Sequence, residues 1–389
     1  MYGKEYTVKT IGIVTCFNQR NVNYGNRLQA VALNQYINGL DREVETVTLQ
    51  FSGFNDNIET KTVSFLRTGF RKIKNKFKTK RPLNSKLNRR LERFNDFSKK
   101  YIKLSPELDR SELKNLDFDA MITGSDIVWY QSSGLFKPIR FLDFQTRRPF
   151  RKYAYAASFG RDWIPEENIP YVKKALNDFQ RITVREKSSI KMLSELGIHQ
   201  VSHAVDSTLL LSKDQWISME KIPDECKNLE NTDFVFVYLL GEETESRNYI
   251  MNIAYHAGLK VVTVPYARGF DNPFDDSFGD IRVMDCSPEE WLWLVHHADY
   301  VITDSFHGVV FSTIYHSRFL VIQRKEFNIN NRLIDYLDTI NQNDKIISID
   351  NSRNLNDFVW DFEVVDRALA PLIDQSRKYL GSIVEGLKA

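Results

Sequence analysis

Cysteine is scarce in this chain. The 389 residues include three cysteines, Cys16, Cys226 and Cys286, which lie far apart. They provide neither a disulfide framework nor the close pairs that bind zinc. The scarcity excludes a small disulfide-stapled scaffold and fits a reducing compartment, where we expect each cysteine to be a small core residue. No His, Cys and acidic cluster indicates a metal centre, so we expect chemistry without a metal or other cofactor.

Long hydrophobic runs are also missing. No run reaches the roughly 18 apolar residues of a membrane-spanning helix. The chain begins MYGKEYTVKTIGIVTCF, where an apolar run of strand length leads into a polar loop, unlike a signal peptide. We therefore expect a cytoplasmic protein. No nucleic-acid-binding motif accompanies the basic residues, so nucleic acid is not an expected partner.

Apolar residues, by contrast, are plentiful: hydrophobic residues make up 42% of the chain and aromatic residues 13%. Strand patterns alternate with helical patterns, which predicts parallel sheets with right-handed crossovers. The length favours two domains. We expect an α/β protein with two doubly wound, Rossmann-like domains that face each other across a cleft. The predicted domains are 1–205 and 206–355, and 356–389 is predicted to form helices that pack back on the first domain.

Basic residues are concentrated in one segment, 66–100, with 14 Lys and Arg against Glu92 and Asp96. We predict a helical insertion there. One interpretation is a solvated surface helix. Another is a surface for anionic lipid or a lipid-linked diphosphate, reached through Lys72, Lys74, Lys76 and Lys78, because Phe70, Ile73 and Phe77 recur at helical spacing among the lysines. The second interpretation predicts a peripheral membrane protein on the inner face.

Clusters of small and polar residues follow the predicted strands. In open parallel sheets, ligands bind at the carboxyl ends of the strands. We therefore expect these clusters to line the cleft between the domains. They are Asn23-Tyr24-Gly25, Gly124-Ser125-Asp126, Ser158-Phe159-Gly160, Arg185-Glu186 and Ser305-Phe306-His307-Gly308.

The last cluster places a histidine where an apolar strand pattern gives way to a helix, in DYVITDSFHGVVFSTIYHS. His307 falls at or just before the first helical turn, where free backbone N–H groups form an anion site. Gly308 would let a ligand approach closely. We predict that His307 acts as a cation or proton donor toward an anionic substrate; the alternative is that it only caps the helix. His296 and His297 lie within a helix and are expected to be structural or surface residues.

Two further charged residues end predicted strands. Arg185 needs an anionic partner at such a position, and its fork suits a carboxylate or a phosphate. The alternative is an internal ion pair with Glu186 or another acid. Asp126 ends a Gly-Ser-Asp turn, where it is either a base for a hydroxyl or only a turn residue.

Seven stretches in this order resemble the polysaccharide pyruvyl transferase family: NYGNRLQAVAL, FDAMITGSDIVW, YAASFG, VREKSS, VDSTLLL, DYVITDSFHGVVFS and NNRLIDYL. The resemblance runs from about residue 11 to 338. Two positions depart from the family's pattern. Ile127 replaces a usual Gln, which we expect to alter acceptor contacts, and Ser207 replaces a usual Pro, which we expect to affect only a turn.

The resemblance implies a fold like that of two-domain GT-B glycosyltransferases and a reaction with phosphoenolpyruvate as donor. A sugar would receive pyruvate as a cyclic ketal on two hydroxyls, in a lipid-linked polysaccharide precursor of a capsule or exopolysaccharide. Arg185 and His307 match the family's donor site. As catalytic residues we expect His307 as acid, Asp126 as base and Arg185. The expected donor-binding residues are Arg185, Ser305, Phe306, His307, Gly308 and Arg332. The expected acceptor-binding residues are Asn23, Tyr24, Gly25, Ser125 and Asp126.

Two other functions fit the same architecture. A GT-B-type glycosyltransferase would use a nucleotide sugar and would need a pocket for a base and ribose. A non-catalytic module would keep the cleft and bind a glycan or a lipid head group, with the basic segment as its anchor. Binding of phosphoenolpyruvate distinguishes the first function from both alternatives.

Overall fold

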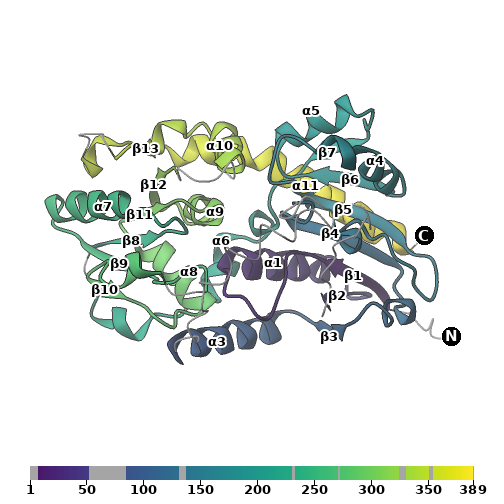
Figure 1. Ribbon diagram of the computed structural model, residues 1–389, viewed down its shortest axis with the longest axis horizontal. Coiled ribbons are helices and arrows are strands. Elements are labelled where there is room, and N and C mark those ends of the chain that lie inside the picture. The colour runs from purple at the N-terminus through teal and green to yellow at the C-terminus, as the bar shows by residue number, and fades with distance from the viewer. Residues whose placement is uncertain are drawn as a thin grey trace, which may run out of the picture.

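The computed structural model describes residues 8–51, 85–130, 137–229, 233–269, 272–323, 330–349 and 354–388. These residues form two parallel sheets, each built from one part of the sequence (Figure 1). The predicted α/β architecture of two doubly wound sheets is confirmed. Lys72, Lys74, Lys76 and Lys78, and with them the predicted lipid-binding face, lie outside the described residues.

The first sheet contains the strands β1 (Lys9–Val14), β2 (Val44–Phe51), β3 (Leu104–Leu108), β4 (Ala120–Asp126), β5 (Arg151–Ala157), β6 (Arg181–Val184) and β7 (Val201–His203). The second contains β8 (Phe234–Tyr238), β9 (Lys260–Thr263), β10 (Ile281–Arg282), β11 (Tyr300–Thr303), β12 (Arg318–Ile322) and β13 (Ile346–Ile347). The helices are α1 (Tyr24–Leu40), α3 (Ser85–Tyr101), α4 (Ile169–Asn177), α5 (Lys187–Glu195), α6 (Lys213–Ile217), α7 (Thr244–His256), α8 (Pro288–His297), α9 (Phe306–Tyr315), α10 (Asn330–Thr339) and α11 (Phe362–Lys388).

The strand order of each sheet reverses once. The orders are β3-β2-β1-β4-β5-β6-β7 and β10-β9-β8-β11-β12-β13. The chain therefore changes direction between β1 and β4 in the first sheet, and between β8 and β11 in the second. Such reversal points open a crevice at the carboxyl ends of the strands, where ligands of doubly wound sheets bind.

The central strands are buried along their whole lengths. Every residue of β4, β8 and β11 is buried. Helices cover both faces of a parallel sheet, so its central strands need apolar side chains on both sides rather than on alternate ones. This requirement explains the continuous apolar runs FVFVY and YVIT in the sequence.

An aromatic cluster joins the part of the molecule that contains the first sheet to the part that contains the second sheet. These parts are called the first half and the second half below. Tyr24, the first residue of α1, stacks on Trp291 of α8 with ring centroids 5.5 Å apart, and it meets Tyr238 of β8 edge to face at 5.7 Å. Its hydroxyl donates a hydrogen bond to the carbonyl of Cys286 at 2.9 Å. Offset and edge-to-face rings add to the stabilisation from buried area. The start of α1, which belongs to the first half, is therefore held by residues of the second half.

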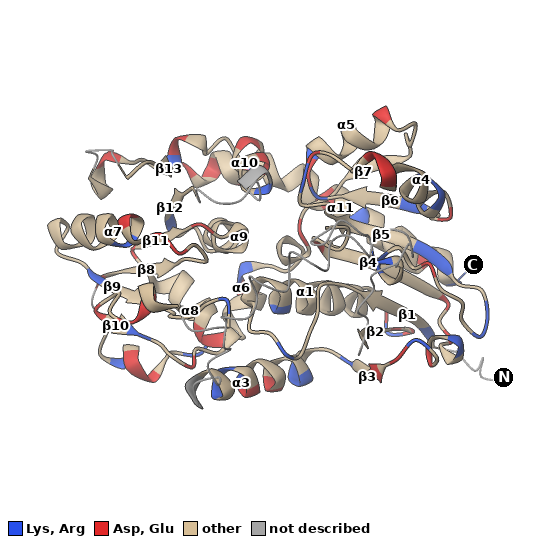
Figure 2. Ribbon diagram, in the orientation of Figure 1, with Lys and Arg blue, Asp and Glu red and all other residues tan. Residues whose placement is uncertain are grey.

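The helix α3, the end of the predicted basic segment, also contacts the second half. Arg90 is fully buried and donates hydrogen bonds to the carbonyls of Pro265, Tyr266 and Met284. Arg93, one turn further along, pairs with Glu290. Figure 2 shows the basic residues of α3 among acidic ones. The interpretation of a solvated helix is wrong for Arg90, because its guanidinium holds the two halves together.

The last helix, α11, returns to the first sheet, as predicted, although the segment forms one 27-residue α-helix rather than several. Tyr379, Leu380 and Ile383 pack in the same cluster as residues of β1 and β4. The Tyr379 hydroxyl also donates to the carbonyl of Ala154 in β5 at 2.9 Å. The beginning of α11, at Val365 and Leu369, packs in the cluster that includes the second sheet.

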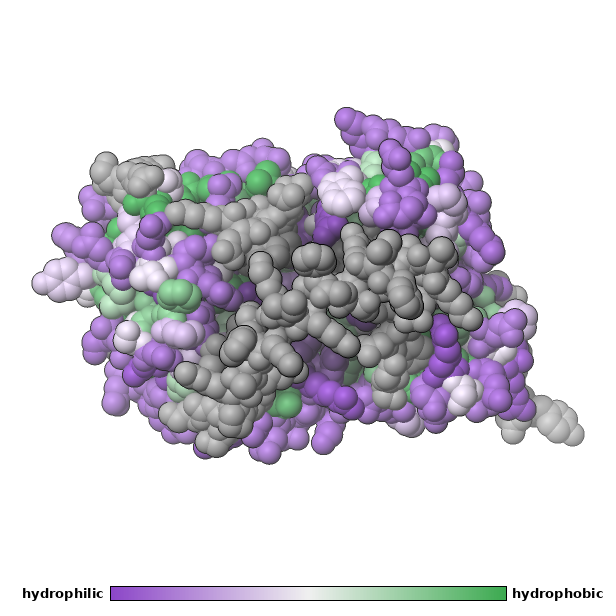
Figure 3. Space-filling model, in the orientation of Figure 1, coloured by the Kyte–Doolittle hydropathy of each residue, from purple (hydrophilic) through white to green (hydrophobic). Residues whose placement is uncertain are grey.

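None of the described helices is both long and apolar enough to cross a bilayer. On the face shown in Figure 3, hydrophilic side chains predominate among the described residues, and hydrophobic ones occur in small groups. Cys226 and Cys286 are buried, as expected of small core residues.

Candidate functional site

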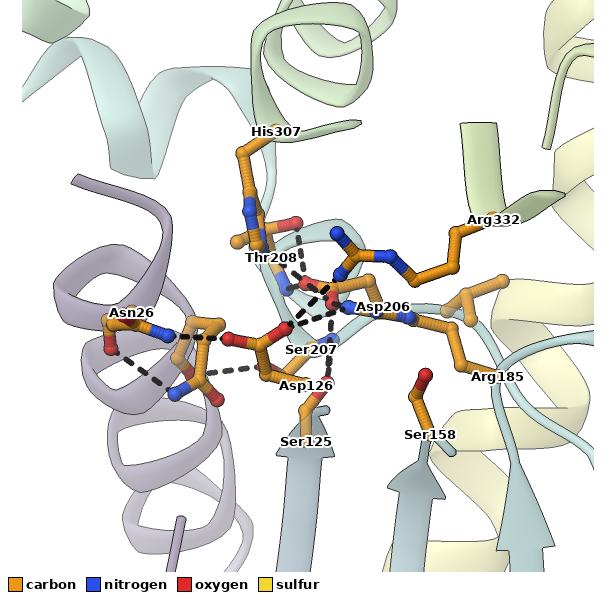
Figure 4. A network of polar contacts seen from close by, with 12 residues as sticks. Asn26, Ser125, Asp126, Ser158, Arg185, Asp206, Ser207, Thr208, His307 and Arg332 are labelled. Carbon is orange, nitrogen blue, oxygen red and sulfur yellow. Dashed lines mark hydrogen bonds and ion pairs between the residues drawn. The ribbon is translucent and has the colours of Figure 1, made fainter. Parts of the chain in front are cut away.

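Charged side chains from both halves meet at the carboxyl ends of the strands (Figure 4). Asp126 ends β4, Arg185 follows β6, and His307 lies in the first turn of α9, which follows β11. Arg332 reaches the same place from α10. The structure therefore brings together four of the charged residues that the sequence singles out, at the predicted edge of the sheets.

Arg185 is held by three carboxylates. Its Nη1 lies 2.7 Å from Oδ2 of Asp206 and 3.4 Å from Oδ1 of Asp126, and its Nε lies 3.0 Å from Oε1 of Glu186. The internal ion pair that the sequence left open is thus present. Burial lowers the pKa of Arg185, but Glu186, Asp206 and Asp126 outweigh burial and raise it, so the guanidinium stays charged. Within the described residues, its buried Nη2 has no hydrogen-bond partner.

Asp206, which sequence reasoning missed as a site residue, is at the centre of this network. Its Oδ2 accepts hydrogen bonds from Arg185 and from the hydroxyl of Ser125 at 3.1 Å. Its Oδ1 accepts from the backbone N–H and the hydroxyl of Thr208, at 3.1 and 2.9 Å, and so caps the short 3-10 turn Ser207–Leu210. Burial raises the pKa of Asp206, but His307 and Arg185 hold it well below its ordinary value.

Asp126 is the second buried carboxylate. Asn26 of α1, another residue that sequence reasoning missed, donates through Nδ2 to Oδ2 of Asp126. Arg332 Nη1 lies 3.7 Å from Oδ1. Burial raises the pKa of Asp126, but Arg185, His307 and Arg332 together hold it below its ordinary value. The carboxylate is therefore an ionised acceptor at neutral pH.

His307 reaches this network from the second half. Its Nε2 lies 3.7 Å from Oδ2 of Asp206, and it has no hydrogen-bond partner among the described residues. On the other side the ring lies against Gly25, where an added Cβ would be 2.0 Å from Nδ1. Gly25 thus contributes to the site by leaving space for the imidazole, because any side chain at this position would displace the ring.

Both arginines approach the phenyl ring of Phe306. The guanidinium carbon of Arg185 is 4.3 Å from the ring centroid, and that of Arg332 is 6.0 Å from it. Cations are attracted to the face of an aromatic ring. Phe306, the first residue of α9, therefore attracts both guanidinium groups to the start of this helix.

The other predicted residues have structural positions around this network. Ser305 is the N-cap of α9 and accepts a hydrogen bond from the N–H of Gly308 at 3.4 Å. Gly308 packs so closely on Thr303 that a Cβ would lie 2.6 Å from Oγ1. Asn23 is the N-cap of α1 and accepts from the N–H of Asn26. Tyr24, with an exposed fraction of 0%, offers no atom to an acceptor, so its predicted acceptor contact is replaced by its place in the aromatic cluster.

A cavity of about 20 Å³ lies beside the network and is lined by Arg185, Asp206, Phe306, Arg332 and Tyr336, among others. Such a volume holds about one water molecule. A larger ligand at this cavity would require a side chain such as Phe306 to turn, or the two halves to separate.

One departure from the family pattern has more consequence than predicted. Ser207 is fully buried, and its hydroxyl donates to the carbonyl of Gln29 in α1 at 2.8 Å. The substitution therefore does more than alter a turn, because it ties the Asp206 turn to the helix that carries Asn26. Ile127 is half-buried, and its Cγ2 lies 3.2 Å from where a Cβ on Gly160 would be.

The comparison with family models identifies the class of protein. Residues 23–326 match the model of the polysaccharide pyruvyl transferase family. The match covers more than half of the chain, so the chain belongs to this family of transferases, as the motifs indicated. The family implies a sugar or polysaccharide acceptor. No match was found among curated proteins.

Solved structures share the fold. A UDP-GlcNAc 2-epimerase from Methanocaldococcus jannaschii, solved with UDP-GlcNAc and UDP, is 11% identical with a TM-score of 0.51, over 98% of this chain and 99% of that one. A putative UDP-N-acetylglucosamine 2-epimerase from Listeria monocytogenes is 12% identical with a TM-score of 0.50, over 96% and 90% of the two chains. At this identity the likeness concerns the fold alone, and it supports the GT-B-like arrangement predicted from the sequence.

Proposed function

We propose that this transferase moves pyruvate from phosphoenolpyruvate onto two hydroxyls of a sugar, as a cyclic ketal, and releases phosphate. The observation that carries the proposal is the meeting of His307 from the second half with Asp206, Arg185 and Asp126 from the first. It provides an imidazole, two ionised carboxylates and two guanidinium groups in one place.

The donor's negative groups would bind at the beginning of α9 and at the arginines. Backbone N–H groups in the first turn of a helix attract anions, and the helix dipole adds to this attraction. Arg185 is already shared by three carboxylates, so it supplies only its unpaired Nη2. Arg332, which pairs with Asp126, adds a second guanidinium near the start of α9.

The reaction begins with a proton. We propose that the imidazolium of His307 protonates the methylene carbon of phosphoenolpyruvate, which leaves a methyl group and an oxocarbenium-like C2. Oδ2 of Asp206, 3.7 Å from Nε2, is placed to pair with the imidazolium before this transfer. A positioned acid of this kind contributes about 10²–10⁴-fold to a rate.

The sugar hydroxyls then add in turn. The first hydroxyl adds to C2 and loses its proton, the C2–O bond to phosphate breaks and phosphate leaves, and the second hydroxyl closes the ring with loss of its own proton. One of the two protons restores the imidazolium, and the other leaves with phosphate. We propose Asp126 as the base. Its lowered pKa suits this role because a hydroxyl bonded to an oxocarbenium carbon is strongly acidic, so a weak base suffices.

The acceptor side of the site comprises Asn23, Gly25, Ser125 and Asp126 in this proposal. Asn26, which already donates to Asp126, is added as a residue that orients the carboxylate. We propose that the sugar belongs to a lipid-linked precursor of a capsule or exopolysaccharide and that Lys72, Lys74, Lys76 and Lys78 bring the cytoplasmic enzyme to an anionic membrane surface. The chemistry itself uses no metal or other cofactor.

Ligand-induced thermal stabilisation tests the proposal without knowledge of the acceptor. A ligand at about 100 times its Kd stabilises a protein by roughly 2.7 kcal/mol, a rise of a few degrees in Tm. We expect phosphoenolpyruvate to raise the Tm of the wild-type protein and to have little effect on His307→Ala. His316→Asn is the matched control, because His316 lies at the exposed C-terminal end of the same helix.

Stabilisation by UDP or UDP-sugars instead of phosphoenolpyruvate would replace this proposal with glycosyl transfer from a nucleotide sugar. Binding of glycan or anionic vesicles with no response to any donor would favour the non-catalytic module. Neutralising Lys72, Lys74, Lys76 and Lys78 should weaken vesicle binding, and unchanged binding would remove the membrane surface from the proposal.

A further inference from the structure

A second group of ionisable side chains lies at the opposite end of α9 from His307. Glu220 follows α6, and His296 and His297 form the last turn of α8. One ligand atom from each of the three residues lies within 4.8 Å of the other two. Neither histidine is near the candidate catalytic network, and the proposed function uses none of the three residues.

The distances among these atoms suit a small divalent ion. Oε2 of Glu220 lies 3.2 Å from Nδ1 of His296 and 3.4 Å from Nε2 of His297. Zinc binds imidazole nitrogen and carboxylate oxygen at about 2.0–2.2 Å, so neighbouring ligand atoms around a tetrahedral zinc are roughly 3.3 Å apart. Two contacts of the group therefore already match the edges of a zinc coordination shell.

The Glu220 carboxylate is buried without full satisfaction. Its side chain has an exposed fraction of 7%, and its buried Oε1 accepts no hydrogen bond among the described residues, although Nδ1 of His296 lies 3.1 Å away. A buried carboxylate oxygen without a hydrogen bond is costly, and a bound cation would compensate it.

Stacking fixes both imidazole rings. His296 stacks on Tyr315, with centroids 4.6 Å apart and an angle of 17° between the planes, and His297 stacks on Trp293 with the same values. Rings held in this way lose little freedom on binding an ion. The exposed fraction of 45% at His297 leaves a side of the group open to solvent, where a water would complete the coordination.

We infer that Glu220, His296 and His297 form a binding site for a divalent transition-metal ion of the zinc type, with three protein ligands and an open fourth position. The ion would link the end of α8 to the segment after α6 and lie beside the C-terminal end of α9. The site is separate from the transfer chemistry, which the proposed function carries out without a metal.

The competing explanation is a metal-free cluster in which protonated histidines pair with Glu220 at a helix C-terminus. Zinc titration distinguishes the two. The full-length, untagged protein is freed of metal with a chelator and titrated with Zn²⁺ against a chromophoric zinc indicator at pH 7.5. We expect one zinc per chain, and a rise in Tm when zinc is added back.

His296→Asn and Glu220→Gln should each weaken zinc binding by at least about 10-fold, a loss that even an outer-shell residue can cause. His256→Asn is the matched control, because His256 is an exposed histidine in the last turn of another helix, α7. The zinc affinity of His256→Asn should equal that of the wild type. Thermal unfolding of each variant without zinc shows whether it is folded, and Glu220→Gln keeps the shape of the side chain.

Zinc K-edge absorption of the loaded protein gives an independent result. We expect nitrogen and oxygen ligands with imidazole scattering. Sulfur ligation would overturn the inference by assigning the ion to a cysteine. Equal zinc affinity in wild type, His296→Asn and Glu220→Gln, or no stoichiometric binding, would also overturn it and leave the metal-free ion cluster.

Discussion

Nε2 of His307 lies 3.7 Å from Oδ2 of Asp206, although the first residue follows a strand of the second sheet and the other follows the last strand of the first. Asp206 also accepts from Arg185 and Ser125 and caps its own turn. A single carboxylate thus connects the imidazole, the guanidinium and the backbone of the site. The predictions below begin with this residue.

Asp206→Ala should destabilise the protein by about 3–5 kcal/mol, because it removes one partner of a buried ion pair and leaves the guanidinium of Arg185 undercompensated. The free energy of unfolding in urea measures the loss. Asp366→Ala is the control, since Asp366 forms an exposed pair with His316 and should cost no more than about 1 kcal/mol. Equal losses in both variants would contradict the central place of Asp206.

Stability should fall with acid, with a sign set by the buried carboxylates. The folded-state pKa values of Asp206 and Asp126 are held below that of an unfolded Asp, about 3.9. Their contribution to stability is therefore fully present above that unfolded value and is lost as the pH falls toward the folded values. The free energy of unfolding should decline below about pH 5, and the decline should be shallower in Asp206→Asn. If the free energy of unfolding fell equally steeply with pH in the wild type and in Asp206→Asn, Asp206 would not be a source of the acid sensitivity.

Gly25→Ala should displace the imidazole of His307, because the added Cβ would lie 2.0 Å from Nδ1. The clash should cost roughly 1–3 kcal/mol and remove the thermal stabilisation by phosphoenolpyruvate. Gly39→Ala is the control within the same helix. Apart from its chain neighbours and the backbone of its own helix, no described atom lies within 4 Å of its Cβ position. We therefore expect a gain of up to about 1 kcal/mol from helix propensity and unchanged donor binding. Normal donor binding by Gly25→Ala would separate His307 from the donor.

Arg90→Ala should loosen the contact between the halves. Its guanidinium satisfies the carbonyls of Pro265, Tyr266 and Met284, and unsatisfied buried groups cost about 1–3 kcal/mol each. Arg89→Ala is the control. The Arg89 side chain, next to Arg90 in the sequence, is mostly exposed and pairs with Asp285 at 2.8 Å, so we expect a loss of at most about 1 kcal/mol. Urea unfolding of both variants measures the difference. Equal stability would show that α3 does not hold the second half.

The sequence predicted the fold well because its strongest signals are local. Strands such as FVFVY and YVIT are apolar along their length, and small residues mark their ends. His307, Arg185 and Asp126 could be singled out for the same reason, since each lies at or just after the end of a predicted strand. Ligands bind at the carboxyl ends of parallel strands, so these three residues could be expected to lie together. The sequence could not show which residue pairs with which.

The missed residues depend on contacts between distant segments. Asp206 lies in the stretch VDSTLLL. Nothing in this local sequence shows whether the aspartate only caps a turn or also binds several charged side chains. Asn26 resembles any polar residue at the start of a helix. Tyr24 was predicted to contact an acceptor because it stands in a polar loop, yet its ring is covered by Trp291 and Tyr238, whose approach no local pattern announces.

The position of Tyr24 limits how freely the two halves can be exchanged between relatives. Its ring belongs to the first half of the chain but fills a space among Trp291, Tyr238 and the carbonyl of Cys286. A chimera that joined this first half to a relative's second half would need a matching recess for the phenol ring. The unit to exchange is therefore the second half together with the first turn of α1, not the second half alone.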